Sequence, residues 1–136
     1  MMASPQEIAE TFELIEDWEE RYRYVIELGK ELPPLAPELK TDGTKVEGCV
    51  SQVWLMSRIR DGHLFLSGDS DAMIVRGLVA ILIAFYEGRA VEDVAALDVN
   101  GYLKRLQLDD HLTPQRSNGL ASMVRRIRAD ATHLAA

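Results

Sequence analysis

The chain has 136 residues, which is enough for one hydrophobic core, and we expect a single domain over residues 1–136. Hydrophobic residues make up 47% of the chain and charged residues 27%, a balance typical of globular proteins rather than disordered ones. The formal net charge is −7, which disfavours nonspecific binding to nucleic acid and docking on anionic membranes, because both carry negative charge.

The cysteine content and the N-terminus indicate a compartment. The chain has one cysteine and cannot form an internal disulfide, so a reducing environment fits best. The first residues lack the basic and apolar regions of a secretion signal. The longest apolar run lies within Met73–Tyr86, is interrupted by Arg76 and is shorter than the ~20 residues that span a bilayer. We therefore expect a cytoplasmic protein without a membrane segment.

Two helices are expected in the N-terminal part. Ser4 and Glu7 have the spacing of a capping box, with Pro5 in the first turn. Asp17 precedes a second helical pattern with the same capping logic. This second helix should end before Pro33, because a proline disfavours helix in the residue that precedes it.

Residues 33–44 contain three prolines and an Asp-Gly pair, which predict a loop. A small antiparallel sheet of about three strands should follow it. Its expected strands are Lys45–Glu47, Val50–Ile59 and His63–Ser67, and Asp61-Gly62 is a strong signal for the hairpin between the last two.

The C-terminal part should be mainly helical, so the expected fold class is α+β. Ser70 is expected to cap a core helix over Ala72–Tyr86 that is apolar nearly all round, and Gly88 should end it. Two short helices and one long one should follow. They are expected at Val91–Leu97, at Gly101–Leu106 and from Thr113-Pro114 onward, the last with an apolar stripe of Leu120, Met123, Ile127 and Leu134.

Cys49 is the first candidate for chemistry. A lone cysteine is most often a small buried hydrophobe. However, Cys49 follows Gly48, which permits a turn that would lift the thiol out of a sheet, and polar Ser51 and Gln52 follow it. This context favours a reactive thiol in a loop.

Other candidates are weaker. Arg116 lies in the first turn of the last helix, where a cation opposes the helix dipole, so it is either solvated or binds an anion or a partner carboxylate. Asp71 is either an ordinary helix-stabilising acid or a functional group. With one cysteine and three dispersed histidines, no metal-ligand spacing is present, and we expect no metal site.

Several motifs along the chain resemble those of the SufE family of sulfur-acceptor proteins. Gly48–Trp54 (GCVSQVW) resembles the family's active-cysteine loop, and Gly68–Leu78 (GDSDAMIVRGL) resembles the start of its central helix. His111–Leu120 (HLTPQRSNGL) resembles the start of its final helix, and Trp18–Tyr22 (WEERY) resembles its first-helix region. The resemblance covers nearly the whole chain, in order.

The resemblance implies an α+β fold shared with cluster-scaffold proteins, and a role in sulfur transfer for iron–sulfur cluster assembly. It implies that Cys49 accepts sulfur as a persulfide from a pyridoxal-phosphate cysteine desulfurase (SufS-like). It also implies that the protein stimulates that enzyme and delivers the sulfur to a scaffold complex (SufBCD-like). The pyridoxal cofactor would belong to the desulfurase, so we expect no cofactor on this chain.

The motifs also suggest supporting residues around Cys49. We expect Ser51, Gln52, Asp71 and Arg116 to bind the partner or to gate the loop. The apolar residues expected to line a cavity around the thiol are Val50, Val53 and Trp54.

Two alternatives stay open. The chain could be an adaptor that activates a desulfurase allosterically, with Cys49 merely structural. It could also be a cysteine hydrolase, although no hydrolase signature surrounds Cys49.

Overall fold

The computed structural model describes residues 3–135, and its first two helices begin at the predicted caps. Helix α1 spans Pro5–Leu14, and α2 spans Trp18–Glu31. The Ser4 hydroxyl accepts a hydrogen bond from the Glu7 N–H at 3.1 Å, and Glu7 Oε1 accepts one from the Ser4 N–H at 3.2 Å. The Asp17 carboxylate accepts a hydrogen bond from the Glu19 N–H at 3.1 Å. The predicted capping box and second cap are therefore confirmed.

The sheet is a single antiparallel hairpin. Strand β1 spans Val53–Arg60 and β2 spans His63–Ser70, and Val53 lies opposite Ser70. The turn between them is the predicted Asp61-Gly62 pair, with φ angles of 54° and 77°. The side chains alternate between two faces, and the leucines of both strands lie on the buried face, which packs against α3.

The predicted third strand is reduced to one bridge. Two strands form the sheet rather than about three, and Lys45 makes an isolated bridge to Trp54. The Val46 N–H donates to the Val53 carbonyl, and the Leu55 N–H donates to the Thr44 carbonyl, each at 2.8 Å. The segment leaves the edge of β1 at Glu47 and Gly48, because the chain turns there toward the cysteine. Before it, residues 33–44 form the predicted loop, with one short 3-10 turn, η1, at Pro37–Leu39.

Helix α3, at Met73–Tyr86, is buried along most of its length, as its composition predicts. The expected cap is wrong in detail, because β2 continues to Ser70 and the helix begins later. Ala72 is the N-cap, and it makes no side-chain capping bond; the Ser70 hydroxyl instead accepts the Ala72 N–H at 3.2 Å. The helix ends just before Gly88, which has a φ of 75°.

Helices α2 and α3 cross at two glycines. A Cβ added at Gly77 would collide with the backbone of Val25, and one added at Gly29 would lie 2.8 Å from the Gly77 nitrogen. The backbones therefore approach more closely than any residue with a side chain would allow.

The C-terminal elements wrap around this core. They are η2 (a 3-10 helix, Val91–Ala96), α4 (Val99–Arg105), α5 (Leu108–His111) and α6 (Pro114–Ala135). Helix α5 was not predicted, whereas the start of α6 at Pro114 was. Leu120, Met123 and Ile127 are buried as expected, but Leu134 is exposed because the helix extends past the core there.

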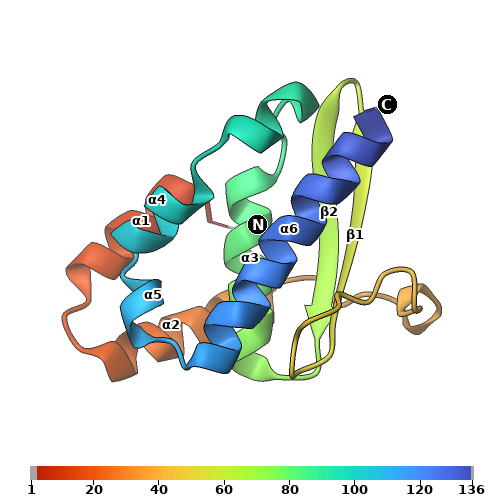
Figure 1. Cartoon of the computed structure of the whole chain (residues 1–136). Helices are drawn as coiled ribbons and strands as arrows, with labels where there is room; N and C mark the ends of the chain where they lie inside the picture. Colours follow the sequence, from red (N-terminus) through yellow and green to blue (C-terminus); the bar gives the residue numbers. More distant parts are fainter. Residues whose placement is uncertain (1–2, 136) are drawn as a thin grey trace.

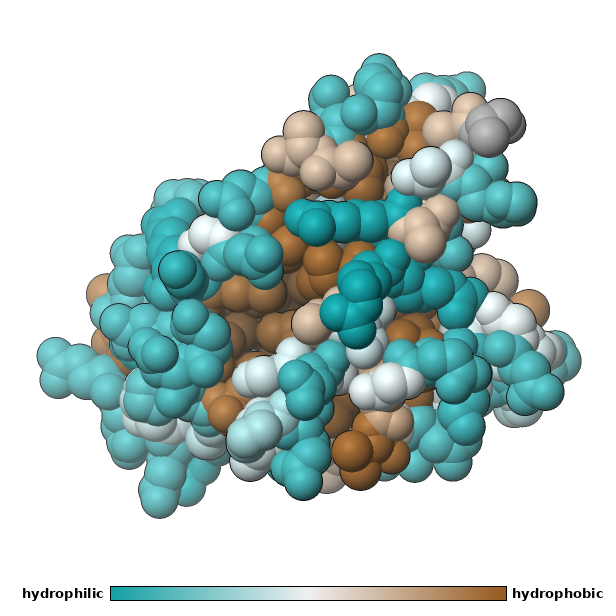
Figure 2. All heavy atoms as spheres, in the orientation of Figure 1, coloured by the Kyte–Doolittle hydropathy of each residue, from teal (hydrophilic) through white to brown (hydrophobic). Residues whose placement is uncertain are grey.

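Figure 1 shows α3 and α6 between the hairpin on one side and α1 and α4 on the other. On the face formed by α4, α5 and α6, Figure 2 shows apolar atoms at the bottom of a recess between hydrophilic side chains. The described part of the chain contains no helix that is both long enough and apolar enough to cross a membrane. The expected α+β class is confirmed.

Candidate functional site around Cys49

Cys49 lies in a short loop between the Lys45 bridge and β1. Gly48 precedes it with a φ of 87°, a conformation that favours glycine. This turn seats the loop on α6, where a Cβ at Gly48 would lie only 2.6 Å from the Ser122 hydroxyl oxygen. The expected role of Gly48, to turn the chain away from the strand, matches this geometry.

The Cys49 thiol is half-buried against the same helix. Its Sγ donates to the Gly119 carbonyl oxygen at 3.6 Å, a long and weak bond of the kind that sulfur makes. Burial raises the pKa of the Cys49 thiol above its ordinary value. Cys49 is therefore partly sheltered from solvent in the free protein.

A cavity of about 370 Å³ opens beside the thiol. Helices α3 and α6 supply its apolar wall, whereas the cysteine loop and the start of α6 supply polar groups. Its lining residues are Cys49, Val50, Ser51, Val75, Leu78, Thr113, Gln115, Arg116, Gly119 and Met123. The cavity thus combines an apolar wall with one cationic side chain, Arg116, at its lining.

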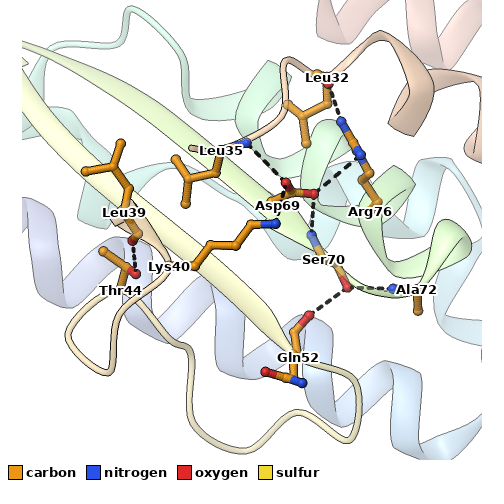
Figure 3. Close-up of polar contacts among 10 residues, drawn as sticks. All are labelled: Leu32, Leu35, Leu39, Lys40, Thr44, Gln52, Asp69, Ser70, Ala72 and Arg76. Atoms are coloured by element: carbon orange, nitrogen blue, oxygen red, sulfur yellow. Dashed lines mark hydrogen bonds and ion pairs between the residues drawn. The ribbon is translucent and has the colours of Figure 1, made fainter. Parts of the chain in front are cut away.

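The far end of the cysteine loop is fixed to the start of α3. The Gln52 N–H donates to the Asp71 carboxylate at 3.0 Å, and the Asp71 N–H donates back to the Gln52 carbonyl at 3.3 Å. The Ser70 hydroxyl also donates to this carbonyl at 2.8 Å, as Figure 3 shows. Gln52 and Asp71 are therefore loop anchors, and neither side chain lines the cavity.

Arg116 reaches the cavity from the first turn of α6. Its backbone N–H donates to the Thr113 hydroxyl at 3.3 Å, which caps the helix. Its guanidinium is partly exposed and has no hydrogen-bond or ion-pair partner within residues 3–135. The structure brings Arg116 and Ser51 to the same cavity as Cys49, although Arg116 lies far from the other two in the sequence.

Two expected lining residues lie elsewhere. Val53 is fully buried in the core, and Trp54 points to the opposite face of β1. The Lys40 ammonium lies 4.9 Å from the centre of the Trp54 ring. The Trp54 indole therefore packs against a cation and does not line the cavity. Strand alternation explains the correction, because β1 directs Val53 into the core and Trp54 to its outer face, so neither side chain reaches the cavity. Val50 does line the cavity, but 82% of it is exposed.

Helix α6 contributes two groups to the site that were not predicted from the sequence. Gly119 brings its carbonyl to the thiol, and Ser122 lies under Gly48. Gly119 could have been predicted from the sequence, since a glycine inside a helical pattern often marks a place where another segment packs closely against the helix. No such signal exists for Ser122.

The described residues offer no metal site. Within residues 3–135, no group of three or more His, Cys, Asp or Glu side chains is arranged to hold a metal ion.

Most of the chain matches one known protein family. Residues 6–131 match the family described as SufE, Fe-S metabolism associated domain. The chain belongs to the SufE family. Its membership supports a role in iron–sulfur metabolism.

Relatives agree with this assignment. An uncharacterized SufE-like protein of Rhizobium etli is 51% identical over 134 residues, covering 96% of this SufE-family chain and 90% of the relative. An uncharacterized SufE-like protein of Rhizobium meliloti is 44% identical, covering 96% of each chain. The solution structure of a hypothetical protein from Thermus thermophilus has the same fold, with a TM-score of 0.77 and 21% identity over 96% of this chain and 94% of that one.

Proposed function

We propose that this SufE-family protein is a sulfur acceptor that takes sulfur from a cysteine desulfurase onto Cys49. The observation that carries the proposal is the position of the chain's only thiol, which is half-buried in a loop that turns at Gly48 and which lines a partly apolar cavity. A cavity beside the thiol leaves room for the additional sulfur atom of a persulfide, whereas a cysteine that only packs in the core requires no such space.

The transfer would be a thiol exchange at sulfur. The Cys49 thiolate attacks the outer sulfur of a persulfide on the desulfurase cysteine, and a new S–S bond forms. The donor's own S–S bond breaks, and its cysteine leaves as a thiolate. One sulfane sulfur moves, no net oxidation occurs, and Cys49 becomes the persulfide carrier. The pyridoxal chemistry that makes the donor persulfide belongs to the desulfurase.

Shelter of Cys49 suits such a carrier. A persulfide is readily reduced by small thiols or oxidised, so a cavity that covers it protects the sulfur in transit. The same burial raises the pKa of the thiol and slows its attack. The conflict is resolved if the loop opens when the desulfurase docks, because the thiol then ionises beside its donor. Gly48 supplies the hinge for that movement.

Arg116, Ser51 and the Gln52–Asp71 contact are the proposed supporting groups. A partly exposed guanidinium at the lining suits a carboxylate or another anion of the partner. The acceptor that follows is an iron–sulfur scaffold complex, and the proposed place of the reaction is the cytoplasm.

Replacing Cys49 tests the proposal against an allosteric adaptor. Alanine and sulfide release by a cysteine desulfurase would be measured with the wild type and with Cys49→Ser. The acceptor role requires loss of stimulation by a variant that still folds. Full stimulation by Cys49→Ser would overturn it in favour of the adaptor. A cysteine hydrolase would instead show turnover without any desulfurase.

A further inference from the structure

Asp69 is a buried carboxylate with four partners. It lies near the end of β2 and is 3% exposed. One oxygen accepts a hydrogen bond from the Leu35 N–H at 3.1 Å and lies 3.3 Å from the Lys40 ammonium. The other accepts the Ser70 N–H at 2.8 Å and lies 3.4 Å from the Arg76 guanidinium (Figure 3). A charge buried this deeply requires such pairing to be tolerated.

These contacts hold the segment of residues 32–40 over the outer face of the hairpin. Asp69 is the cross-strand partner of Trp54, so the two side chains share that face. Lys40 bridges them, since it contacts both the carboxylate and the indole ring. Arg76 donates in addition to the Leu32 carbonyl at 2.6 Å. The carboxylate thus joins the chain that follows α2 to the start of α3.

The same carboxylate adjoins the anchor of the cysteine loop. It fixes the N–H of Ser70, whose hydroxyl donates to the Gln52 carbonyl, and the next residue, Asp71, holds the Gln52 N–H. Upstream of Cys49, the chain runs from the held segment to the Lys45 bridge. Asp69 therefore contacts or adjoins both ends of the cysteine loop. It binds the segment upstream of Cys49 directly, and downstream of Cys49 it acts on Gln52 through Ser70 and Asp71.

We propose that Asp69 is a positioning residue for Cys49, which keeps the cysteine loop seated on α6 and the thiol partly sheltered. This proposal deepens the sulfur-acceptor role, on which its purpose rests, but the seating itself is a property of the free protein. In Asp69→Asn the side chain keeps its shape and loses its charge, so Lys40 and Arg76 are left uncompensated. The upstream segment and the Gln52 anchor should both loosen.

The alternative is that Asp69 only stabilises the fold, and Glu87 offers a matched control. Glu87 also has a carboxylate that accepts a backbone hydrogen bond on β2, from the Leu66 N–H at 3.0 Å. It follows the C-terminal end of the 14-residue helix α3, about 20 Å from the end that holds the cysteine loop. Glu87→Gln should lower stability without reaching Cys49.

The test is the rate of Cys49 alkylation by iodoacetamide, measured across pH on the full chain without a desulfurase. Because the chain has one cysteine, the modified site is unambiguous. Asp69→Asn should shift the midpoint of the pH profile down by about one unit, and so raise the rate at neutral pH about tenfold. Glu87→Gln should leave both unchanged. An unchanged rate in a folded Asp69→Asn variant, or an equal rise in both variants, would overturn the proposal.

A second variant covers the case in which Asp69→Asn does not fold. The Lys40 side chain is 31% exposed, and Lys40→Met leaves Asp69 with its three other partners. A smaller rise in alkylation rate is expected for this variant, and no rise would contradict the proposal. Either negative result would leave the sulfur-acceptor role standing, because the measurement involves no sulfur donor.

Discussion

Gln52 and Asp71 are joined by two reciprocal hydrogen bonds, one from the Gln52 N–H to the Asp71 carboxylate at 3.0 Å and one from the Asp71 N–H to the Gln52 carbonyl at 3.3 Å. This contact fixes the downstream end of the cysteine loop to the start of α3. The upstream end turns at Gly48, which lies on α6. The loop is thus held at two points, and Cys49 lies between them.

Asp71→Ala should therefore release the loop. We expect a stability loss of about 1 kcal/mol, because one exposed hydrogen bond to a carboxylate is removed. Cys49 should react faster with iodoacetamide in the free protein. Asp93→Ala, which removes an exposed acid of η2, is the control for the change in charge. Equal alkylation rates for wild type and Asp71→Ala would show that this contact does not restrain the loop.

Gly48→Ala tests the seat of the loop on α6. Alanine at a φ of 87° is strained by about 1–2 kcal/mol, and its Cβ would also collide with the Ser122 hydroxyl. Gly88→Ala is a close control, because its φ is 75° but no atom lies within 4 Å of the added Cβ. Denaturant unfolding and Cys49 alkylation would be measured for both.

Only Gly48→Ala should raise the alkylation rate, and adding Ser122→Gly should partly reverse the rise by removing the collision. If Gly88→Ala raised the alkylation rate equally, backbone strain alone would explain the rise. The proposed packing of the cysteine loop on α6 would then be wrong.

Arg116→Ala should weaken desulfurase stimulation while changing stability by no more than about 0.5 kcal/mol, since its guanidinium is partly exposed and unpaired within residues 3–135. Titration calorimetry would measure the affinity for the desulfurase. Arg23→Ala is matched in charge and lies on the exposed surface of α2. The proposed anion contact fails if Arg116→Ala binds and stimulates like Arg23→Ala.

Asp69 should contribute to stability in a pH-dependent manner. Burial alone would raise the pKa of its carboxyl, but the hydrogen bonds from Leu35 and Ser70 and the charges of Lys40 and Arg76 lower it overall. A carboxyl with a lowered folded-state pKa stabilises the fold above its unfolded pKa of about 4, and this contribution is lost as the pH falls through the folded value.

The free energy of unfolding of Asp69→Asn, followed from pH 7 downward, should therefore differ most from that of the wild type near neutral pH. The difference should shrink below about pH 4, where the wild-type carboxyl also becomes neutral. A constant difference across this range would show that Asp69 is not charged in the folded protein.

Features set by neighbouring residues were predictable from the sequence. The Ser4–Glu7 capping box and the Asp61-Gly62 turn depend on contacts within a few residues, and both occur as expected. A strand was expected at Lys45–Glu47. Whether it forms depends on how many of its residues pair with β1, and local propensity does not determine that number. The chain turns away at Gly48, and one bridge remains.

The site was predictable only where its residues carry their own signal. Cys49 was identified by its type and by Gly48. Trp54 was wrongly expected to line the cavity, because the neighbouring residues do not show which face of β1 it occupies. The burial of Asp69 depends on Lys40 and Arg76, which converge only in the folded chain. Nothing in the local sequence distinguishes this buried acid from the exposed Asp71 two residues later.

Mass spectrometry of the protein after incubation with a cysteine desulfurase and free cysteine tests the central claim most directly. The account predicts one extra sulfur atom on the peptide that contains Cys49, present only when both desulfurase and cysteine are supplied and removed by a reducing thiol. An unmodified Cys49 under conditions in which the protein still stimulates the desulfurase would contradict it.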